Sequence, residues 1–269
     1  MIIENTIKII ENRYSDYLEK LFISDARIGI FLSAIKLSDN NIGISSTLPS
    51  DHSENHCKKE NRDFGAFTPF HITGKKVKDL LYTPKDNAIV NTLKIAALNA
   101  ISLKILVNNR YKILKNTDPF NLIDLNGKKS ITLVGAFPSY IHRISETSHN
   151  LQVLEFNRET LGREHWKYYV PAKDFEKVLP HSDIVIITGV TLANNTFDEL
   201  IKSINPAAQT IVTGPSSSFI PDAMFAKGVN IMGGIRIKEP GKILQLVSEA
   251  ATGYHLFRYG AEKICILNE

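Results

Sequence analysis

Two buried strands, each followed by a loop of small hydroxyl residues, place the strongest constraint on this fold. The apolar run 183–187 leads into the loop 188–191, and the run 210–213 leads into the loop 214–218. Apolar runs of this kind are typical of parallel strands that are covered on both faces. In an open α/β sheet, the ligand crevice lies outside the carboxyl ends of such strands. The sequence therefore predicts where a binding site lies before it indicates any reaction.

The composition fits a globular protein and excludes several other classes. The chain has 269 residues, 43% of them hydrophobic and 22% charged, which is enough for one large domain or two smaller ones. The net charge of +4 is small and its Lys and Arg residues are scattered, so we expect no nucleic-acid partner. The apolar stretches look too short for a membrane span, and the N-terminus lacks the features of a signal peptide.

Cysteine usage points to a reducing compartment. The two cysteines, Cys57 and Cys265, lie far apart and form no CxxC motif, which argues against a disulfide scaffold. We therefore expect a cytoplasmic protein with a small-molecule ligand, no nucleic-acid partner and no membrane partner. Its oligomeric state stays open, and a homodimer is compatible with the sequence.

The first part of the chain predicts a helix and a hairpin followed by two more helices. Apolar residues recur at helical spacing over 3–21, a strand is expected over 26–37, and a turn at 39–41 leads into a return strand at 42–44. Helices are expected over 75–82 and 86–107, the second with a face of small residues suited to close packing. These elements make an α+β domain over residues 1–118.

The polar segment 49–63 contains the most metal-like cluster of the chain. His52, His56 and Cys57 lie close together there. Metal sites normally add a second pair of ligands further along the chain, and none follows here. We therefore expect a solvated loop and no metal site.

From residue 130 the pattern changes to strands that alternate with helices. Strands are expected over 131–134, 151–154, 184–187, 211–213 and 229–231, with an edge strand over 263–266. This alternation predicts a Rossmann-like parallel sheet over residues 119–269, reached through a linker at 108–129. Thr196 lies three residues before Glu199, which is the spacing of a helix capping box.

The loop after the first of these strands does not suit a dinucleotide. Pyrophosphate binding needs repeated glycines and free backbone amides, but this loop has one glycine, Gly135, followed by the bulky Phe137 and by Pro138. Glu155 lies twenty residues after Gly135, where Rossmann proteins place the acid that holds a ribose hydroxyl. A nucleoside-type ligand such as S-adenosylmethionine stays open, as does a Glu155 that only faces solvent or pairs with Arg158.

The two hydroxyl loops supply most of the candidate ligand contacts. The candidates in and after the first of them are Thr188, Gly189, Thr191 and Asn194. The candidates in the second are Gly214, Pro215, Ser216 and Ser217. Such residues recognise a ligand by hydrogen bonds, but they also make caps and turn bonds at strand ends. The serines lack the Gly-x-Ser-x-Gly elbow of a nucleophile, so we expect ligand binding rather than acylation.

Several longer segments resemble a known family. Residues 188–196, 212–217 and 228–234, together with 91–100 in the first half, are similar to the putative heavy-metal chelation domain family and its N-terminal companion. The family has no known function. The resemblance implies an enolase N-terminal-like domain joined to a Rossmann-like domain, with the site between them. It also implies condensation or hydrolysis in pterin, flavin or siderophore-type metabolism linked to metal chelation.

The leading functional hypothesis is a protein that holds a small polar or heterocyclic ligand in an interdomain cleft. Asn91 or, as an alternative, Asn99 is expected to approach the rim near Thr188 and Gly214 from the first domain, with Gly135 and Phe137 in the rim. Glu155 is the candidate catalytic residue, as general base or ribose anchor. The alternatives are a non-catalytic protein that binds a metal complex and a methyltransferase-like protein. The sequence identifies no cofactor, and hydroxyls and amides are poor ligands for a soft metal.

Overall fold

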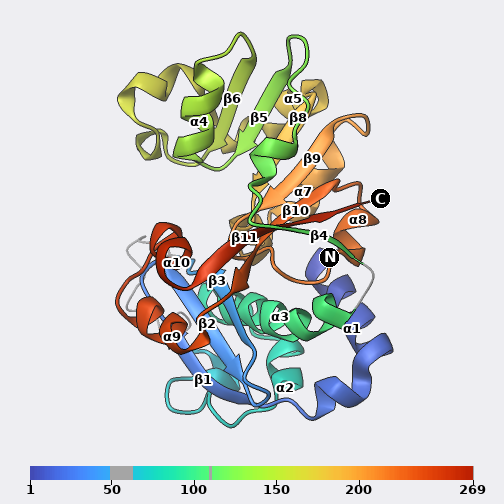
Figure 1. Cartoon of the computed structure of the whole chain (residues 1–269), viewed down its shortest axis with the longest axis vertical. Helices are drawn as coiled ribbons and strands as arrows, with labels where there is room; N and C mark the ends of the chain where they lie inside the picture. The colour runs from blue at the N-terminus through green and yellow to red at the C-terminus, as the bar shows by residue number, and fades with distance from the viewer. Residues whose placement is uncertain (49–62, 109–110, 269) are drawn as a thin grey trace.

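The computed structural model describes residues 1–48, 63–108 and 111–268, and it contains two sheets. The smaller sheet is antiparallel, in the order β1 (Ile23–Ile28), β2 (Leu32–Leu37) and β3 (Ile42–Ser46). It is accompanied by α1 (Ile2–Glu19), α2 (Val77–Leu81) and α3 (Ala88–Asn108) (Figure 1). The expected strand over 26–37 is wrong in one respect. The chain turns after Ile28, and the Gly29 amide donates to the Leu32 carbonyl at 3.0 Å, which makes two strands of it.

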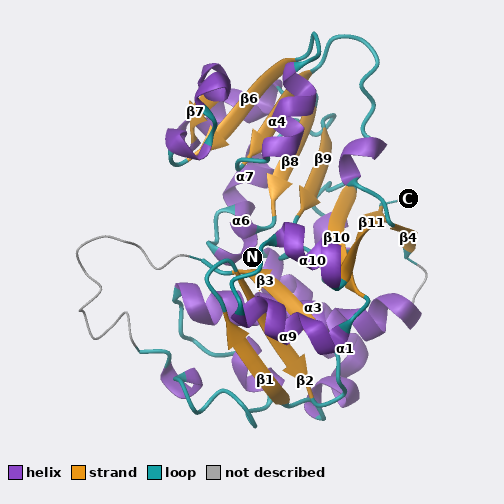
Figure 2. Cartoon of the chain, turned by 60° about the vertical axis from the view of Figure 1, so that its left-hand side comes forward, coloured by secondary structure: helices purple, strands orange, loops and turns teal. Residues whose placement is uncertain are grey.

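The larger sheet has eight strands and is mostly parallel. Its order is β4-β11-β10-β9-β8-β5-β6-β7, and only β11 and β4 run antiparallel to their neighbours (Figure 2). The strands are β4 (Lys112–Lys115), β5 (Ser130–Val134), β6 (Asn150–Glu155), β7 (Tyr169–Pro171), β8 (Ile184–Thr188), β9 (Gln209–Thr213), β10 (Ile231–Ile237) and β11 (Ala261–Leu267). The predicted α/β class, an α+β part followed by a Rossmann-like sheet, is confirmed.

Two details of this sheet differ from the prediction. Residues 112–115, expected in a linker, form β4 and pair with β11, so β11 is not the edge strand. The strand expected at 229–231 begins at Ile231 and runs to Ile237, because β11 pairs with it along its whole length. Residues 112–115 are too few to show a periodic pattern, and burial along Ile231–Ile237 does not alternate. Pairing with β11 defines both strands.

Helices connect and cover these strands. They are α4 (Pro138–Ser145), α5 (Phe175–Val178), α6 (Val190–Ala193), α7 (Phe197–Ser203), α8 (Asp222–Phe225), α9 (Pro240–Ser248) and α10 (Gly253–Tyr259). Several are single turns, and short 3₁₀ turns fill the segment between β6 and β8. The α-helix of that segment, α5, has only four residues, as does α8 between β9 and β10.

α3 packs on the smaller sheet. A Cβ added to Gly43 in β3 would lie 2.0 Å from the Ala96 carbonyl and 2.3 Å from the Ala100 nitrogen, so the helix packs directly on the strand. This confirms the expected face of small residues. By length and composition alone α3 could cross a membrane, so the prediction that every apolar stretch is too short for a membrane span is wrong. However, 72% of its apolar window is buried inside the protein, as in a core helix.

The C-terminal helices complete the smaller sheet. A buried cluster joins Leu32, Ala34 and Ile44 of that sheet with Ile243 and Val247 of α9. Figure 1 shows α9 beside β1 and β2, on the side away from α3, and α10 next to β11. Residues 240–259 therefore finish the core of the first part, and the two parts of the chain interlock.

Candidate functional site

A cavity of about 820 Å³ opens at the carboxyl ends of β5, β6 and β8. From β5 the chain builds the sheet in one direction through β6 and β7, and then returns to β8 on the other side of β5. The cavity lies at this reversal of strand order, where open α/β sheets bind their ligands. Its volume suits a small molecule. The lining residues include Gly135, Ala136, Glu155, Phe156, Tyr169, Lys173, Phe175, Thr188, Thr191, Asn194 and Glu199.

The walls of this cavity all come from residues 134–200. The sequence predicts an interdomain cleft with Asn91 in one wall, but this cavity is not that cleft. Among the described lining residues, none belongs to the first part of the chain. Asn91 instead donates from Nδ2 to Asp86 Oδ1 at 2.7 Å and lines a different cavity.

Gly135 and Glu155 shape the loop at the end of β5. Gly135 has a φ of +100°, and a Cβ there would lie 2.8 Å from the Thr188 methyl group, so the position requires glycine. The Ala136 amide donates to Glu155 Oε2 at 3.0 Å, and the Gly135 amide donates to the Leu154 carbonyl at 2.9 Å. Since Pro138 has no N–H, this loop offers few amides to a pyrophosphate.

Glu155 lies half-buried at the end of β6, where its second oxygen accepts from the Phe156 amide at 2.8 Å. Each oxygen thus has one backbone donor and keeps a further lone pair for a ligand. The alternative that Glu155 pairs with Arg158 finds no support. The Arg158 guanidinium lies over the Trp166 ring, 4.2 Å from its centroid.

Thr188 at the end of β8 lines the cavity together with Thr191 and Asn194 from the following segment, and their hydrogen bonds distinguish them. The Thr191 hydroxyl donates to the Thr188 carbonyl at 2.7 Å, which commits its only hydrogen. The Thr188 hydroxyl accepts a long bond of 3.4 Å from the Val190 amide, and its own hydrogen has no partner among the described residues. Thr188 is therefore the better donor to a ligand.

Asn194 offers a second open donor. Its Oδ1 accepts from the Thr196 amide at 3.2 Å and from the Thr196 hydroxyl at 2.7 Å. Its amide nitrogen has no partner in the part of the chain that the structure describes. The same bonds overturn the capping box predicted at Thr196: this residue is the N-cap of α7, but its side chain bonds Asn194 and not the helix.

The loop after β9 does not face this cavity, contrary to expectation. Ser216 and Ser217 are 0% exposed. The Ser216 hydroxyl lies 3.1 Å from that of Ser45 and accepts from the Ser46 amide at 3.0 Å. The Ser217 hydroxyl donates to the carbonyls of Gly214 and Gly233 at 2.9 and 2.8 Å. These serines bind the protein to itself.

The backbone of the same loop is also committed. The Gly214 amide donates to the Gly233 carbonyl at 3.1 Å, and the Pro215 carbonyl accepts from Asn99 Nδ2 at 3.0 Å. Gly189 lies against this loop, because a Cβ there would be 3.2 Å from Ser216 Cβ. Gly189, Gly214 and Pro215 are thus committed to contacts within the protein and do not line the cavity.

Asn99 of α3, predicted as the alternative to Asn91, lies against the loop that contains Gly214. Its Nδ2 donates to the carbonyls of Ile44 and Pro215 at 2.6 and 3.0 Å, and its Oδ1 accepts from the Ser218 amide at 3.1 Å. Asn99 is 1% exposed and holds the two parts of the chain together.

Phe137 also turns away from the cavity. Its ring stacks on Tyr140, with centroids 5.4 Å apart and 15° between the planes, in the core under α4. The sequence analysis missed the aromatic wall of the cavity, formed by Phe156, Tyr169 and Phe175. Tyr169 belongs to a strand of three residues, too short for a periodic pattern, and only pairing with β6 reveals it.

The described residues hold no group of three or more His, Cys, Asp and Glu side chains able to bind a metal ion. Around the cavity the polar side chains are hydroxyls and amides, with the carboxylates of Glu155 and Glu199 and the amine of Lys173. Such a set does not suit a soft heavy metal. His52, His56 and Cys57 lie outside the described residues.

Comparison with known proteins gives two family matches and two solved structures of similar fold. Residues 118–266 and 11–102 match two family models, DUF364 and DUF4213, both described as "Putative heavy-metal chelation". A DUF364 protein of unknown function from Pyrococcus horikoshii is 19% identical, with a TM-score of 0.79 and 100% of both chains covered. One from Desulfitobacterium hafniense is 18% identical, with a TM-score of 0.72 and coverage of 99% and 98%. Among curated proteins no sequence match is found.

The matched regions account for most of the chain, and the similar structures share its whole fold at low identity. The match over residues 118–266 alone spans more than half of the chain, and this region contains both hydroxyl loops and the cavity. The chain belongs to the DUF364 family, described as "Putative heavy-metal chelation".

Proposed function

We propose that the protein binds a small polar molecule with a flat heterocyclic part in the cavity at the ends of β5, β6 and β8. The observation that carries this proposal is the pair of open donors, the Thr188 hydroxyl and the Asn194 amide nitrogen, which line the same cavity as the acceptor oxygens of Glu155. A polar group left unpaired in a half-buried site is costly unless a ligand or water completes it. Together these groups offer both donors and acceptors to one ligand.

The apolar part of the cavity suits the body of such a ligand. Phe156, Tyr169 and Phe175 stand in its wall, and aromatic rings stack on planar heterocycles. The volume of about 820 Å³ is in the range of known small-molecule pockets. Pterin, flavin-precursor and nucleoside ligands all combine a flat ring with an edge of donors and acceptors.

The role of metal chelation is then indirect. Because the described residues do not fit a soft metal ion, we derive no step through one. The ligand itself would be the chelating compound, its precursor, or its complex with a metal. If the protein is an enzyme for condensation or hydrolysis, Glu155 is the residue placed to move a proton. If it is a carrier, Glu155 only anchors the ligand.

The test is calorimetric titration of wild type with a panel of 6-hydroxymethylpterin, lumazine, adenosine and S-adenosylmethionine. Binding by a member of the panel, weakened in Glu155→Gln, supports the site. Loss of turnover with affinity retained would then indicate a general base, whereas loss of affinity would indicate an anchor. Wild type that binds no member, or binding that a Glu155→Gln variant leaves unchanged, contradicts the proposal. Thermal melts of both proteins control for folding.

A further inference from the structure

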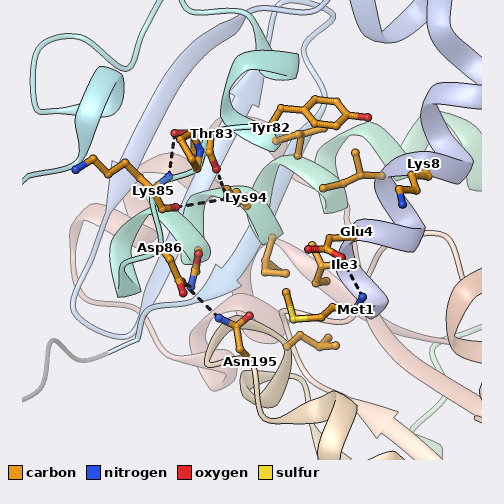
Figure 3. Close-up of a pocket in the computed structure, with 16 residues that line it drawn as sticks. Met1, Ile3, Glu4, Lys8, Tyr82, Thr83, Lys85, Asp86, Lys94 and Asn195 are labelled. Carbon is orange, nitrogen blue, oxygen red and sulfur yellow. Dashed lines mark hydrogen bonds and ion pairs between the residues drawn. The ribbon is translucent and has the colours of Figure 1, made fainter.

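A second cavity, of about 560 Å³, lies between the two parts of the chain. Its walls come from α1, from residues 81–86, from α3 and from the turn that follows α6 (Figure 3). It is separate from the cavity at the carboxyl ends of β5, β6 and β8, called the sheet-end cavity below. Asn194 lines the sheet-end cavity, and the neighbouring Asn195 lines the second cavity. The first cavity is built within one part of the chain, while this one lies at their junction.

Lys94 of α3 lines this second cavity and is half-buried. Its Nζ donates to the Thr83 carbonyl at 2.9 Å and, over a long 3.5 Å, to the Lys85 carbonyl. Both partners are neutral. Burial lowers the pKa of the Lys94 amine, while the more distant charges of Asp86 and Glu4 act in the opposite direction. The third N–H of the ammonium group has no partner among the described residues.

The two carboxylates near Lys94 already have donors of their own. Glu4 accepts from the amino group of Met1 at 3.0 Å. Asp86 Oδ1 accepts from Asn91 Nδ2 at 2.7 Å and from Asn195 Nδ2 at 3.4 Å, as Figure 3 shows. Neither of these two carboxylates forms a hydrogen bond or an ion pair with Lys94. A half-buried ammonium group without an ionic partner is unusual, because buried charges are normally paired.

Part of the lining is aliphatic and is formed by Ile3, Ile7, Leu81, Ile95 and Leu192. Lys8 adds a second cation on the side of α1. Lys85 also lines the cavity, but its ammonium group pairs with Asp63. The cavity thus combines the half-buried ammonium group of Lys94 with an aliphatic wall.

From this combination we propose that the cavity between the two parts of the chain binds a small organic carboxylate, whose carboxylate accepts from Lys94 and whose apolar body lies on Ile7, Ile95 and Leu192. A charge-assisted hydrogen bond supplies the missing ionic partner, and the aliphatic walls exclude a fully hydrated ion such as free phosphate. Since the walls come from both parts of the chain, the bound carboxylate also stabilises their junction.

Benzoate is the first probe, with benzamide as its neutral counterpart and inorganic phosphate as an anion without an apolar body. By calorimetry we expect wild type to bind benzoate more tightly than benzamide or phosphate. Lys94→Met keeps the length of the side chain and should weaken benzoate binding by roughly tenfold. Lys202→Met, an exposed lysine on α7, is the matched control and should leave it unchanged.

A measurement on the wild type keeps the proposal testable if Lys94→Met does not fold. Acetic anhydride labelling, read by peptide mass spectrometry, should modify Lys94 more slowly when benzoate is present, and Lys202 at an unchanged rate. Thr188→Val should leave benzoate binding intact, which separates this site from the sheet-end cavity. Equal binding of benzoate and benzamide, preference for phosphate, or no protection of Lys94 would each overturn the proposal.

Discussion

The loops after β8 and β9 are alike in sequence and opposite in their surroundings. Both follow a buried parallel strand and both are rich in small hydroxyl residues. The loop after β8 contributes Thr188 and Thr191 to the sheet-end cavity, whereas Ser216 and Ser217 after β9 are 0% exposed. The difference is what lies opposite each loop. β3 and α3 cover the second loop and use up its hydrogen bonds, while the first stands at the reversal of strand order.

This comparison shows that hydroxyl residues at a strand end do not by themselves mark a ligand site. The same side chains serve as interior hydrogen-bonding groups wherever another layer covers them. The position of the loop in the sheet decides between the two roles. Changes to the covered loop should therefore alter stability, and changes to the open loop should alter ligand affinity.

The largest effect is expected at Asn99. Asn99→Leu keeps the volume but removes three hydrogen bonds, leaving the carbonyls of Ile44 and Pro215 and the Ser218 amide short of a partner. We expect the free energy of unfolding to fall by about 3 to 5 kcal/mol in urea titrations. Asn91→Leu on the same helix is the control and should cost less than about 1 kcal/mol, because Asn91 bonds only an exposed carboxylate. Equal losses would show that Asn99 does not hold the covered loop.

A smaller loss is expected at Ser217. Ser217→Ala removes a buried hydroxyl from the carbonyls of Gly214 and Gly233, but both carbonyls keep a backbone donor, the amides of Ser217 and Gly214. The free energy of unfolding should therefore fall by only about 1 kcal/mol. Ser248→Ala, at an exposed position of α9, provides the matched control and should be close to neutral. A loss at Ser248 as large as that at Ser217 would contradict the role of the buried hydroxyl.

Much of the fold could be predicted from the sequence, because β5, β6, β8 and β9 are largely buried and rich in apolar residues. β4 and β7 could not be predicted. They have three or four residues, and only pairing with β11 and β6 makes them strands. The interlocking of α9 with the first sheet likewise depends on packing between residues about 200 positions apart, which no local pattern records.

The candidate site was predicted in part. Gly135, Glu155, Thr188, Thr191 and Asn194 were placed at strand ends by the Rossmann pattern, and the structure brings all five to one cavity. The serines of the covered loop had the same local signal. Nothing in residues 214–218 themselves indicates that Ser45 and Asn99, more than a hundred positions away, complete their hydrogen bonds.

Acid titration distinguishes the two loops, which are held by neutral hydrogen bonds, from the ionic contacts of Asp118 near β11 of the same sheet. Burial alone would raise the pKa of Asp118, but hydrogen bonds from Lys263, Tyr140 and the Phe120 amide together lower it. A lowered pKa contributes stability above about pH 4, the unfolded value, and that contribution is lost as the pH falls through the folded value. In Asp118→Asn, the free energy of unfolding should therefore fall less steeply than in wild type as the pH drops below about 4. The difference between Asn99→Leu and wild type should stay constant with pH, and a change in it would contradict the assignment of a neutral network.

The central claim is that the loop after β8 recognises the ligand and the loop after β9 does not. It is tested most directly by titrating Thr188→Val and Ser217→Ala with whichever member of the heterocycle and nucleoside panel binds wild type. Thr188→Val removes the open hydroxyl and should weaken binding by about 1 kcal/mol, roughly fivefold, with little change in stability, while Ser217→Ala should bind as wild type does. Unchanged affinity in Thr188→Val, or a loss as large in Ser217→Ala, would contradict the account.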